Sequence, residues 1–193
     1  MINHEAFWKL VFETPERGKL LLQALAILKT VDTCIEIGVA TGNHAAAIKS
    51  ILNPKKLYLL DAWGLDEAYL EITKESPAEF YHALWLTQAM FFGDAAVEII
   101  QGKSTVEHKR FEDGDFDFIY IDANHSYDAV KKDLENWFPK LRSGGVFAGH
   151  DYCEKTGFGV IQAVDEFRAN NTDKIKNFTT YGSGLQKCWM VET

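Results

Sequence analysis

Residues 116–151 read FDFIYIDANHSYDAVKKDLENWFPKLRSGGVFAGHD, which predicts a strand, a helix and a second strand in succession. The first run, FDFIYID, is rich in the aromatic and β-branched residues that strands favour. From Ser126 to Leu141, apolar residues recur at helical spacing. The opposite side of this helix is expected to carry Lys131, Lys132, Asp133 and Glu135. A turn at 142–145 then leads into the second strand, VFAGHD, so the stretch predicts a parallel βαβ unit of an α/β fold.

The rest of the chain repeats this alternation in both directions. Short apolar runs, each followed by a segment of helical character, occupy 33–38, 57–61 and 97–100. Residues 178–181 and 188–191 flank a Gly-Ser-Gly turn and predict a hairpin. We therefore expect a three-layer, doubly wound α/β fold with a mainly parallel seven-stranded sheet that ends in an antiparallel C-terminal hairpin.

Length and composition predict one globular domain over residues 1–193, with helices in 1–30 and a helical lid in 63–92. The chain has 193 residues, of which 47% are hydrophobic, and it has no linker-like stretch. No apolar run approaches the roughly 18 residues of a membrane span, and the first residues, MINHEAFWKL, lack a signal pattern. Three cysteines without a C-x-x-C pair favour a reducing compartment, so we expect a cytoplasmic protein.

The formal net charge of −8 limits the class of partner. A protein that binds nucleic acid needs a field of Lys and Arg to attract phosphates, and none is visible in the sequence. We expect neither a nucleic acid nor a membrane as a partner, and a small neutral or cationic ligand fits the acidity better than a polyanion. The sequence leaves open whether the chain forms a homo-oligomer.

In open α/β sheets the ligand lies beyond the carboxyl ends of the strands. The first strand ends in EIGVATG (36–42), whose glycines allow close approach of a ligand to the backbone. The dinucleotide pattern G-x-G-x-x-G fails here because positions 40 and 43 are Ala and Asn, and a phosphate loop fails at 102–104 because position 97 is Val. Asp61 ends the second strand and can accept hydrogen bonds from both ribose hydroxyls of a nucleotide cofactor. Trp63 can offer a flat face to adenine.

These strand ends resemble a known family. EIGVATG (36–42) resembles the cofactor loop of class I S-adenosylmethionine-dependent methyltransferases, and LDAW (60–63) resembles their second motif. The block 117–152, continued by 159–167, is similar to a subfamily that includes small-molecule and sugar O-methyltransferases. The resemblance runs from about residue 30 to the end of the chain. It implies transfer of a methyl group from S-adenosylmethionine to a hydroxyl of a small molecule or a sugar.

The resemblance also implies which residues bind the cofactor. Glu36 would position its methionine part, Asp61 would hold the ribose, and Ala62 and Trp63 would lie beside the adenine. For Ser104, a role as helix N-cap is an equal alternative. The full set of implied cofactor residues is Glu36, Gly38, Thr41, Gly42, Asp61, Ala62, Trp63, Gly102, Lys103, Ser104 and Asp122.

Asp122 and His125 follow the fourth strand, and His150 and Asp151 end the fifth, so their side chains can converge if the strands are adjacent. In metal-dependent members of related families, the positions of Asp122, His150 and Asp151 hold a divalent cation that activates the acceptor hydroxyl. Carboxylates suit Mg²⁺, but His150 stands where a second carboxylate is common, which makes Mg²⁺ less certain than a first-row metal.

Other interpretations of these residues remain open at this stage. His125 or His150 can act as a general base without a metal. Alternatively, Asp122 and His125 only cap the helix that starts at Ser126. At the level of the whole protein, the rivals are a nicotinamide-dependent oxidoreductase, disfavoured by Ala40, and a non-catalytic cofactor-binding or interaction protein of the same fold.

Overall fold

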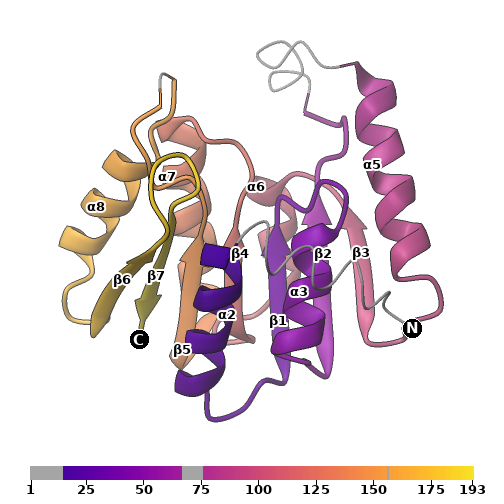
Figure 1. Ribbon diagram of the computed structural model, residues 1–193. Helices are drawn as coiled ribbons and strands as arrows, with labels where there is room; N and C mark the ends of the chain where they lie inside the picture. Colours follow the sequence, from indigo (N-terminus) through magenta and orange to yellow (C-terminus); the bar gives the residue numbers. More distant parts are fainter. Residues whose placement is uncertain (1–14, 67–75, 156) are drawn as a thin grey trace.

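The computed structural model describes residues 15–66, 76–155 and 157–193, which form one seven-stranded sheet with helices on both faces (Figure 1). The strand order is β3-β2-β1-β4-β5-β7-β6. The first five strands pair in parallel, and β7 runs antiparallel to both β5 and β6. The strands are β1 (Thr33–Ile37), β2 (Lys56–Asp61), β3 (Val97–Gln101), β4 (Phe116–Ile121), β5 (Leu141–Gly149), β6 (Asn177–Tyr181) and β7 (Cys188–Glu192). The expected doubly wound fold with a C-terminal hairpin is confirmed.

Helices cover the two faces of the sheet and bury a separate core on each. The helices are α2 (Pro15–Ile27), α3 (Asn43–Ile51), α5 (Pro77–Met90), α6 (Ser104–Glu107), α7 (Tyr127–Trp137) and α8 (Val160–Asn170). One core joins α2 and α3 to the side chains on one face of the strands, and the other joins α7 and α8 to the opposite face. Successive strand residues alternate between the cores: Cys34 packs in the first and Ile35 in the second. Within the described ranges, no helix has the length and apolarity needed to cross a membrane.

Two element boundaries differ from the sequence-based expectation. The helix expected to reach Leu141 ends at Trp137, and a 3-10 turn covers Phe138–Lys140. Pro139 explains this early end, because proline lacks the N–H that a continued helix requires. β5 then starts at Leu141, so the turn expected at 142–145 lies inside the strand, where the pairing register with β4 shifts.

One side-chain assignment on α7 was wrong. Asp133, expected on the solvent side of this helix, is only 2% exposed. The other charged residues of that stretch, Lys131, Lys132 and Glu135, are exposed as expected.

The expected N-terminal helices and lid fall partly outside the described residues, which exclude 1–14 and 67–75. The described part of the N-terminal region forms α2, and that of the lid region includes α5, which lies at the β3 edge of the sheet (Figure 1). Thr87 is the buried residue of α5, and its hydroxyl donates a hydrogen bond to the carbonyl of Ala40 in the loop after β1 (3.0 Å).

Candidate active site

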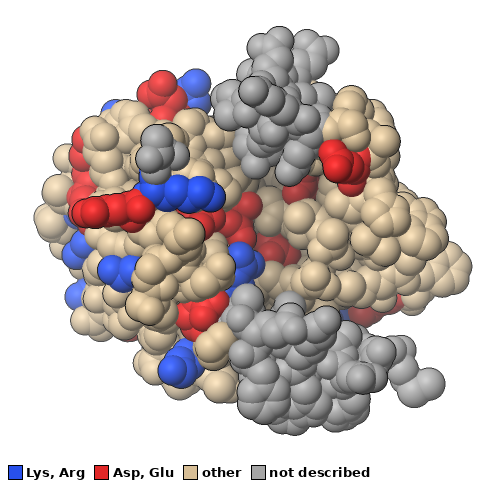
Figure 2. Space-filling view, turned by 45° about the horizontal axis from the view of Figure 1, so that its top comes forward, with Lys and Arg blue, Asp and Glu red and all other residues tan. Residues whose placement is uncertain are grey.

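The parallel strand order brings the carboxyl ends of β3, β2, β1 and β4 together around a cavity of about 460 Å³. The hollow lies near the centre of the face shown in Figure 2, with acidic side chains around it. Eight of the residues expected to bind the cofactor line it: Gly38, Asp61, Ala62, Trp63, Gly102, Lys103, Ser104 and Asp122. Glu36, Thr41 and Gly42 do not belong to this lining.

The floor of the cavity requires glycine at position 38. Gly38 has a φ of +87°, and a Cβ there would lie 2.1 Å from the carbonyl oxygen of Asp122. The backbones at the ends of β1 and β4 can therefore pack closely only because residue 38 has no side chain. This contact sets Asp122 directly beside the loop that follows β1.

Asp61 organises that loop through its carboxylate. Its Oδ2 accepts hydrogen bonds from the N–H groups of Val39 (2.8 Å) and Ala40 (2.9 Å), and its Oδ1 accepts one from the N–H of Trp63 (2.8 Å). An ionised carboxylate has about four acceptor positions, so three are used and one remains. The ribose role expected of Asp61 stays a prediction, with one acceptor position left open beside these three backbone donors.

Trp63 is a wall of the cavity and not a freely exposed platform. Its side chain is fully buried, and its Nε1 donates a hydrogen bond to the carbonyl oxygen of Ala40 (2.9 Å). Both Ala40 and Trp63 have a positive φ, +49° and +37°, which non-glycine residues adopt rarely. The hydrogen bonds to Asp61 and Ala40 hold this unusual backbone in place.

Glu36 is buried outside the cavity lining and pairs with a residue that the sequence did not single out. Its Oε1 lies 2.8 Å from Nδ1 of His44 on α3. Burial raises the pKa of Glu36 well above its usual value, against the opposing effect of Arg17. Burial likewise lowers the pKa of His44, and Arg17 adds to that effect. Both directions of pKa shift favour a pair in which Glu36 and His44 are uncharged.

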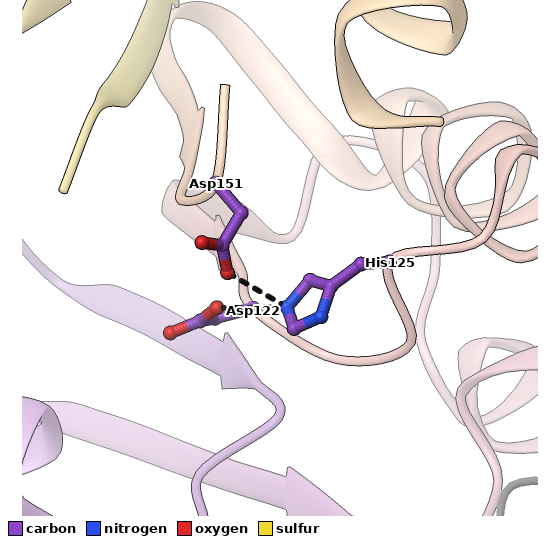
Figure 3. A group of neighbouring side chains, drawn as sticks. All are labelled: Asp122, His125 and Asp151. Carbon is purple, nitrogen blue, oxygen red and sulfur yellow. Dashed lines mark hydrogen bonds and ion pairs between the residues drawn. The ribbon is translucent and has the colours of Figure 1, made fainter. Parts of the chain in front are cut away.

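Asp122, His125 and Asp151 lie close together at the carboxyl ends of β4 and β5 (Figure 3). Nε2 of His125 lies 2.9 Å from Oδ2 of Asp151 and 3.5 Å from Oδ1 of Asp122. One potential ligand atom from each residue lies within 4.8 Å of the others, a spacing that can hold a metal ion. The three residues come from the ends of β4 and β5 and the loop before α7.

His150, the expected third ligand, lies next to Asp122 and Asp151. It is buried, and its Nδ1 lies 3.2 Å from Oδ2 of Asp151 and 3.9 Å from Oδ1 of Asp122. The structure therefore brings all four predicted residues together, and it adds His125 to Asp122 and Asp151 as a group with metal-ligand spacing. For the helix-capping interpretation, the side chains of Asp122 and His125 pair with each other, with Arg17 and with Asp151. The N–H of Ser126, the N-cap residue of α7, donates to Oδ1 of Asn124 (2.9 Å).

The charges of this group are strongly coupled. Burial alone would lower the pKa of His125, but hydrogen bonds to Asp122 and Asp151 outweigh it and raise the pKa to about 9. Burial opposes ionisation of Asp122 and Asp151, yet their histidine partners, and Arg17 for Asp122, hold both pKa values below the usual range. At neutral pH the group consists of two carboxylates and an imidazolium.

Arg17 contacts the site but was not among the residues that the sequence singled out. It lies on α2, about 100 residues away along the chain, and its Nη2 donates a hydrogen bond to Oδ2 of Asp122 (2.8 Å). The sequence predicted that this part of the chain is helical. Only the packing of α2 against the sheet reveals that Arg17 faces the site.

The part of the cavity formed by the loop after β3 also differs from expectation at one residue. The N-cap position of α6 falls on Lys103, so Ser104 is not the cap. Its hydroxyl instead faces the buried carboxyl group of Asp133 on α7, which it helps to ionise. Both residues line the cavity.

Comparison with known proteins identifies a matching protein family. A family profile described as a methyltransferase domain matches residues 35–152. A curated relative, the uncharacterized protein y4gI of Sinorhizobium fredii, is 42% identical over 59 residues, which are 30% of this chain and 6% of that protein. This chain therefore spans only a small part of that relative's length.

Solved structures with low sequence identity share the fold. A Corynebacterium glutamicum protein superposes with a TM-score of 0.67 at 14% identity, covering 100% of this chain and 91% of that one. A candidate rRNA methylase from Clostridium thermocellum gives 0.66 at 15%, covering 92% and 94%. A candidate caffeoyl-CoA O-methyltransferase from Staphylococcus aureus gives 0.63 at 16%, covering 96% and 89%. Since the family profile covers more than half of the chain and the sheet has the matching strand order, the protein belongs to the family of class I S-adenosylmethionine-dependent methyltransferase domains.

Proposed function

We propose that the protein transfers the methyl group of S-adenosylmethionine to a hydroxyl oxygen of a small molecule or a sugar, with a divalent cation held by Asp122, His125 and Asp151. The observation that carries this proposal is the position of Asp122. It lines the cofactor cavity and also belongs to the group with metal-ligand spacing. Cofactor and acceptor would therefore meet at this residue.

The residues of the cavity fit the cofactor. The free acceptor position on Asp61 suits one ribose hydroxyl, and the closely packed backbone at Gly38 leaves room for the methionine part. With the ribose at the end of β2, the sulfonium would lie toward β1 and β4, near Asp122, and the adenine toward β3. The methyl group would then face the metal-ligand group, as in-line transfer to a bound oxygen requires.

The donor set of two carboxylates and one imidazole suits a first-row divalent metal, and Mg²⁺ less well. Such a cation would lower the pKa of the acceptor hydroxyl. His150 would orient Asp151 through its Nδ1, which lies 3.2 Å from Oδ2 of Asp151. With a pKa of about 9, His125 holds a proton at neutral pH when no metal is present, so it cannot then accept one from a substrate. A metal-free mechanism would have to rest on His150 instead.

Isothermal titration calorimetry tests the two halves of the proposal separately. S-adenosylhomocysteine should bind the wild type with and without metal. Mn²⁺ should bind one site in the wild type and at least about tenfold more weakly in Asp151→Asn, because the variant loses a charged ligand. Asp128→Asn, an exposed change on α7, is the matched control and should leave binding unchanged.

The outcomes separate the competing functions. Equal Mn²⁺ binding by the wild type and Asp151→Asn, or none by either, would reject the metal site. Methyl transfer from radiolabelled S-adenosylmethionine to a panel of hydroxyl compounds then tests catalysis. Cofactor binding without any methyl transfer across the panel would identify the chain as a non-catalytic binding protein, and binding of NAD alone would identify an oxidoreductase.

A further inference from the structure

Asp133 is a buried acid whose position none of the interactions described so far explains. It lies on α7, is 2% exposed, and lines the cofactor cavity. Among the described residues its Oδ1 has no hydrogen-bond partner. Burial raises the pKa of this carboxyl group to about 7, although a hydrogen bond from Ser104 acts in the opposite direction. A buried polar atom without a partner is costly, so its presence in a native protein calls for an explanation, such as a functional role or a bound group that completes the hydrogen bond.

The place of Asp133 within the cavity indicates which part of the cofactor it would meet. The ribose position is set by Asp61 at the end of β2, and the methionine side lies toward Gly38 and Asp122. The rest of the lining comes from α5, the loops after β2, β3 and β4, and α7. On α7, Ala129 and Asp133 are one turn apart and both line the cavity. With the ribose at Asp61 and the methionine part toward Gly38, as the proposed function has them, the region between the loop after β3 and Asp133 can take the purine base.

We propose that Asp133 recognises the Watson–Crick edge of the adenine, with Oδ1 accepting a hydrogen bond from the 6-amino group. The inference rests on the cofactor part of the proposed function and deepens it, because it names the residue that selects adenine. The 6-amino group is a donor and suits an acceptor-only oxygen. The hydroxyl of Ser104, on the other side, keeps the carboxyl group oriented. Binding of the cofactor would thus complete the partner that Oδ1 lacks.

The test compares S-adenosylhomocysteine with its 6-deamino analogue, in which a hydrogen replaces the amino group. Dissociation constants are measured by calorimetry at pH 8.5, where the Asp133 carboxyl is ionised. The wild type should prefer the amino compound by about 10- to 100-fold, the range for a hydrogen bond to a charged group. Asp133→Ala should reduce this preference to about threefold or less. Asp133→Asn keeps an amide oxygen that can accept the bond and should retain part of the preference.

Glu135→Gln provides a matched control, since it removes an acid from an exposed position on the same helix and should leave the preference unchanged. If the wild type binds both compounds equally, or if Asp133→Ala keeps the full preference, the assignment of Asp133 is wrong while cofactor binding stands. If the wild type binds neither compound, the proposed function fails and this inference fails with it. Because the wild type alone can overturn the proposal, its outcome does not depend on the folding of a variant.

Discussion

At the scale of single residues, Asp133 should lower the stability of the protein in the absence of cofactor. Its pKa is raised by burial from 3.8 to about 7. Between these values the native state binds more protons than the unfolded state, so the free energy of unfolding falls as the pH rises through this window. About three pKa units correspond to at most ~4 kcal/mol. Asp133→Asn should therefore be more stable than the wild type above pH 7 and show no gain below about pH 4.

Urea denaturation of both proteins at pH 4, 6 and 8 without cofactor measures this effect, with Glu135→Gln as the control for lost surface charge. A variant that is no more stable than the wild type at pH 8 would contradict the prediction. If Asp133→Asn is more stable but prefers the 6-amino compound less than the wild type does, Asp133 serves cofactor binding and not stability.

The sequence predicted the residues that directly follow strands, because a strand end in a parallel sheet is a position with a known neighbourhood. Gly38, Asp61 and Asp122 all lie at the cavity for this reason. Residues that reach the site from helices were missed. Asp133 had a detectable signal: it lies three residues after Val130 and four before Trp137, which places it on the buried stripe of α7. Its charged neighbours in the sequence concealed that spacing.

At the scale of elements, α2 contributes to the site through Arg17 and should tune its affinity for cations. The guanidinium occupies Oδ2 of Asp122 and places a positive charge beside the metal-ligand group. Arg17→Met removes that charge, so it should strengthen Mn²⁺ binding by about 5- to 10-fold, a change of about 1 kcal/mol that a single charge produces at moderate screening. Without metal, the same variant should be less stable, because the half-buried Asp122 loses one of its two cationic partners.

Calorimetry with Mn²⁺ and thermal unfolding with and without metal measure both effects. Lys19→Met is the control, because Lys19 is an exposed cation on the same helix. Weaker Mn²⁺ binding by Arg17→Met would show instead that Arg17 orients Asp122 for the metal, which would reverse the role given to α2.

The seven strands and the alternation of strands and helices followed from periodicity, since apolar runs and amphipathic stripes are local properties of the sequence. The ends of elements were less predictable. Proline at position 139 stops α7 before its apolar pattern ends, and the glycines at 144 and 145, expected in a turn, lie within β5 at its register shift. The pairing of β5 with β4 decides that boundary, and pairing partners are not visible in the sequence of one strand.

At the scale of the whole molecule, strand order creates the site. β1 pairs with both β2 and β4, so the loop after β1 meets the ends of both neighbours at the point where the order reverses. The N–H of Asp122 bonds to the carbonyl of Ile37 (2.7 Å), which joins the two strand ends directly. The order itself could be expected only from the family resemblance, because the alternation of elements is compatible with several orders.

The charge of the whole molecule should select the methyl acceptor. Five acids line the cavity, namely Asp61, Asp66, Glu79, Asp122 and Asp133, against one base, Lys103, and the chain has a net charge of −8. An anionic acceptor would meet repulsion at the surface and in the cavity.

We therefore expect neutral or cationic hydroxyl compounds to be methylated at least about tenfold faster than anionic ones such as CoA thioesters. We also expect no saturable binding of RNA. Radiolabel transfer from S-adenosylmethionine to sugars, amino sugars, phenols and a caffeoyl-CoA substrate measures the acceptor preference. Fluorescence anisotropy of labelled RNA at about 50 and about 200 mM salt measures RNA binding. Preferred turnover of the CoA thioester, or RNA binding that weakens with salt, would mean that the net charge does not govern acceptor choice.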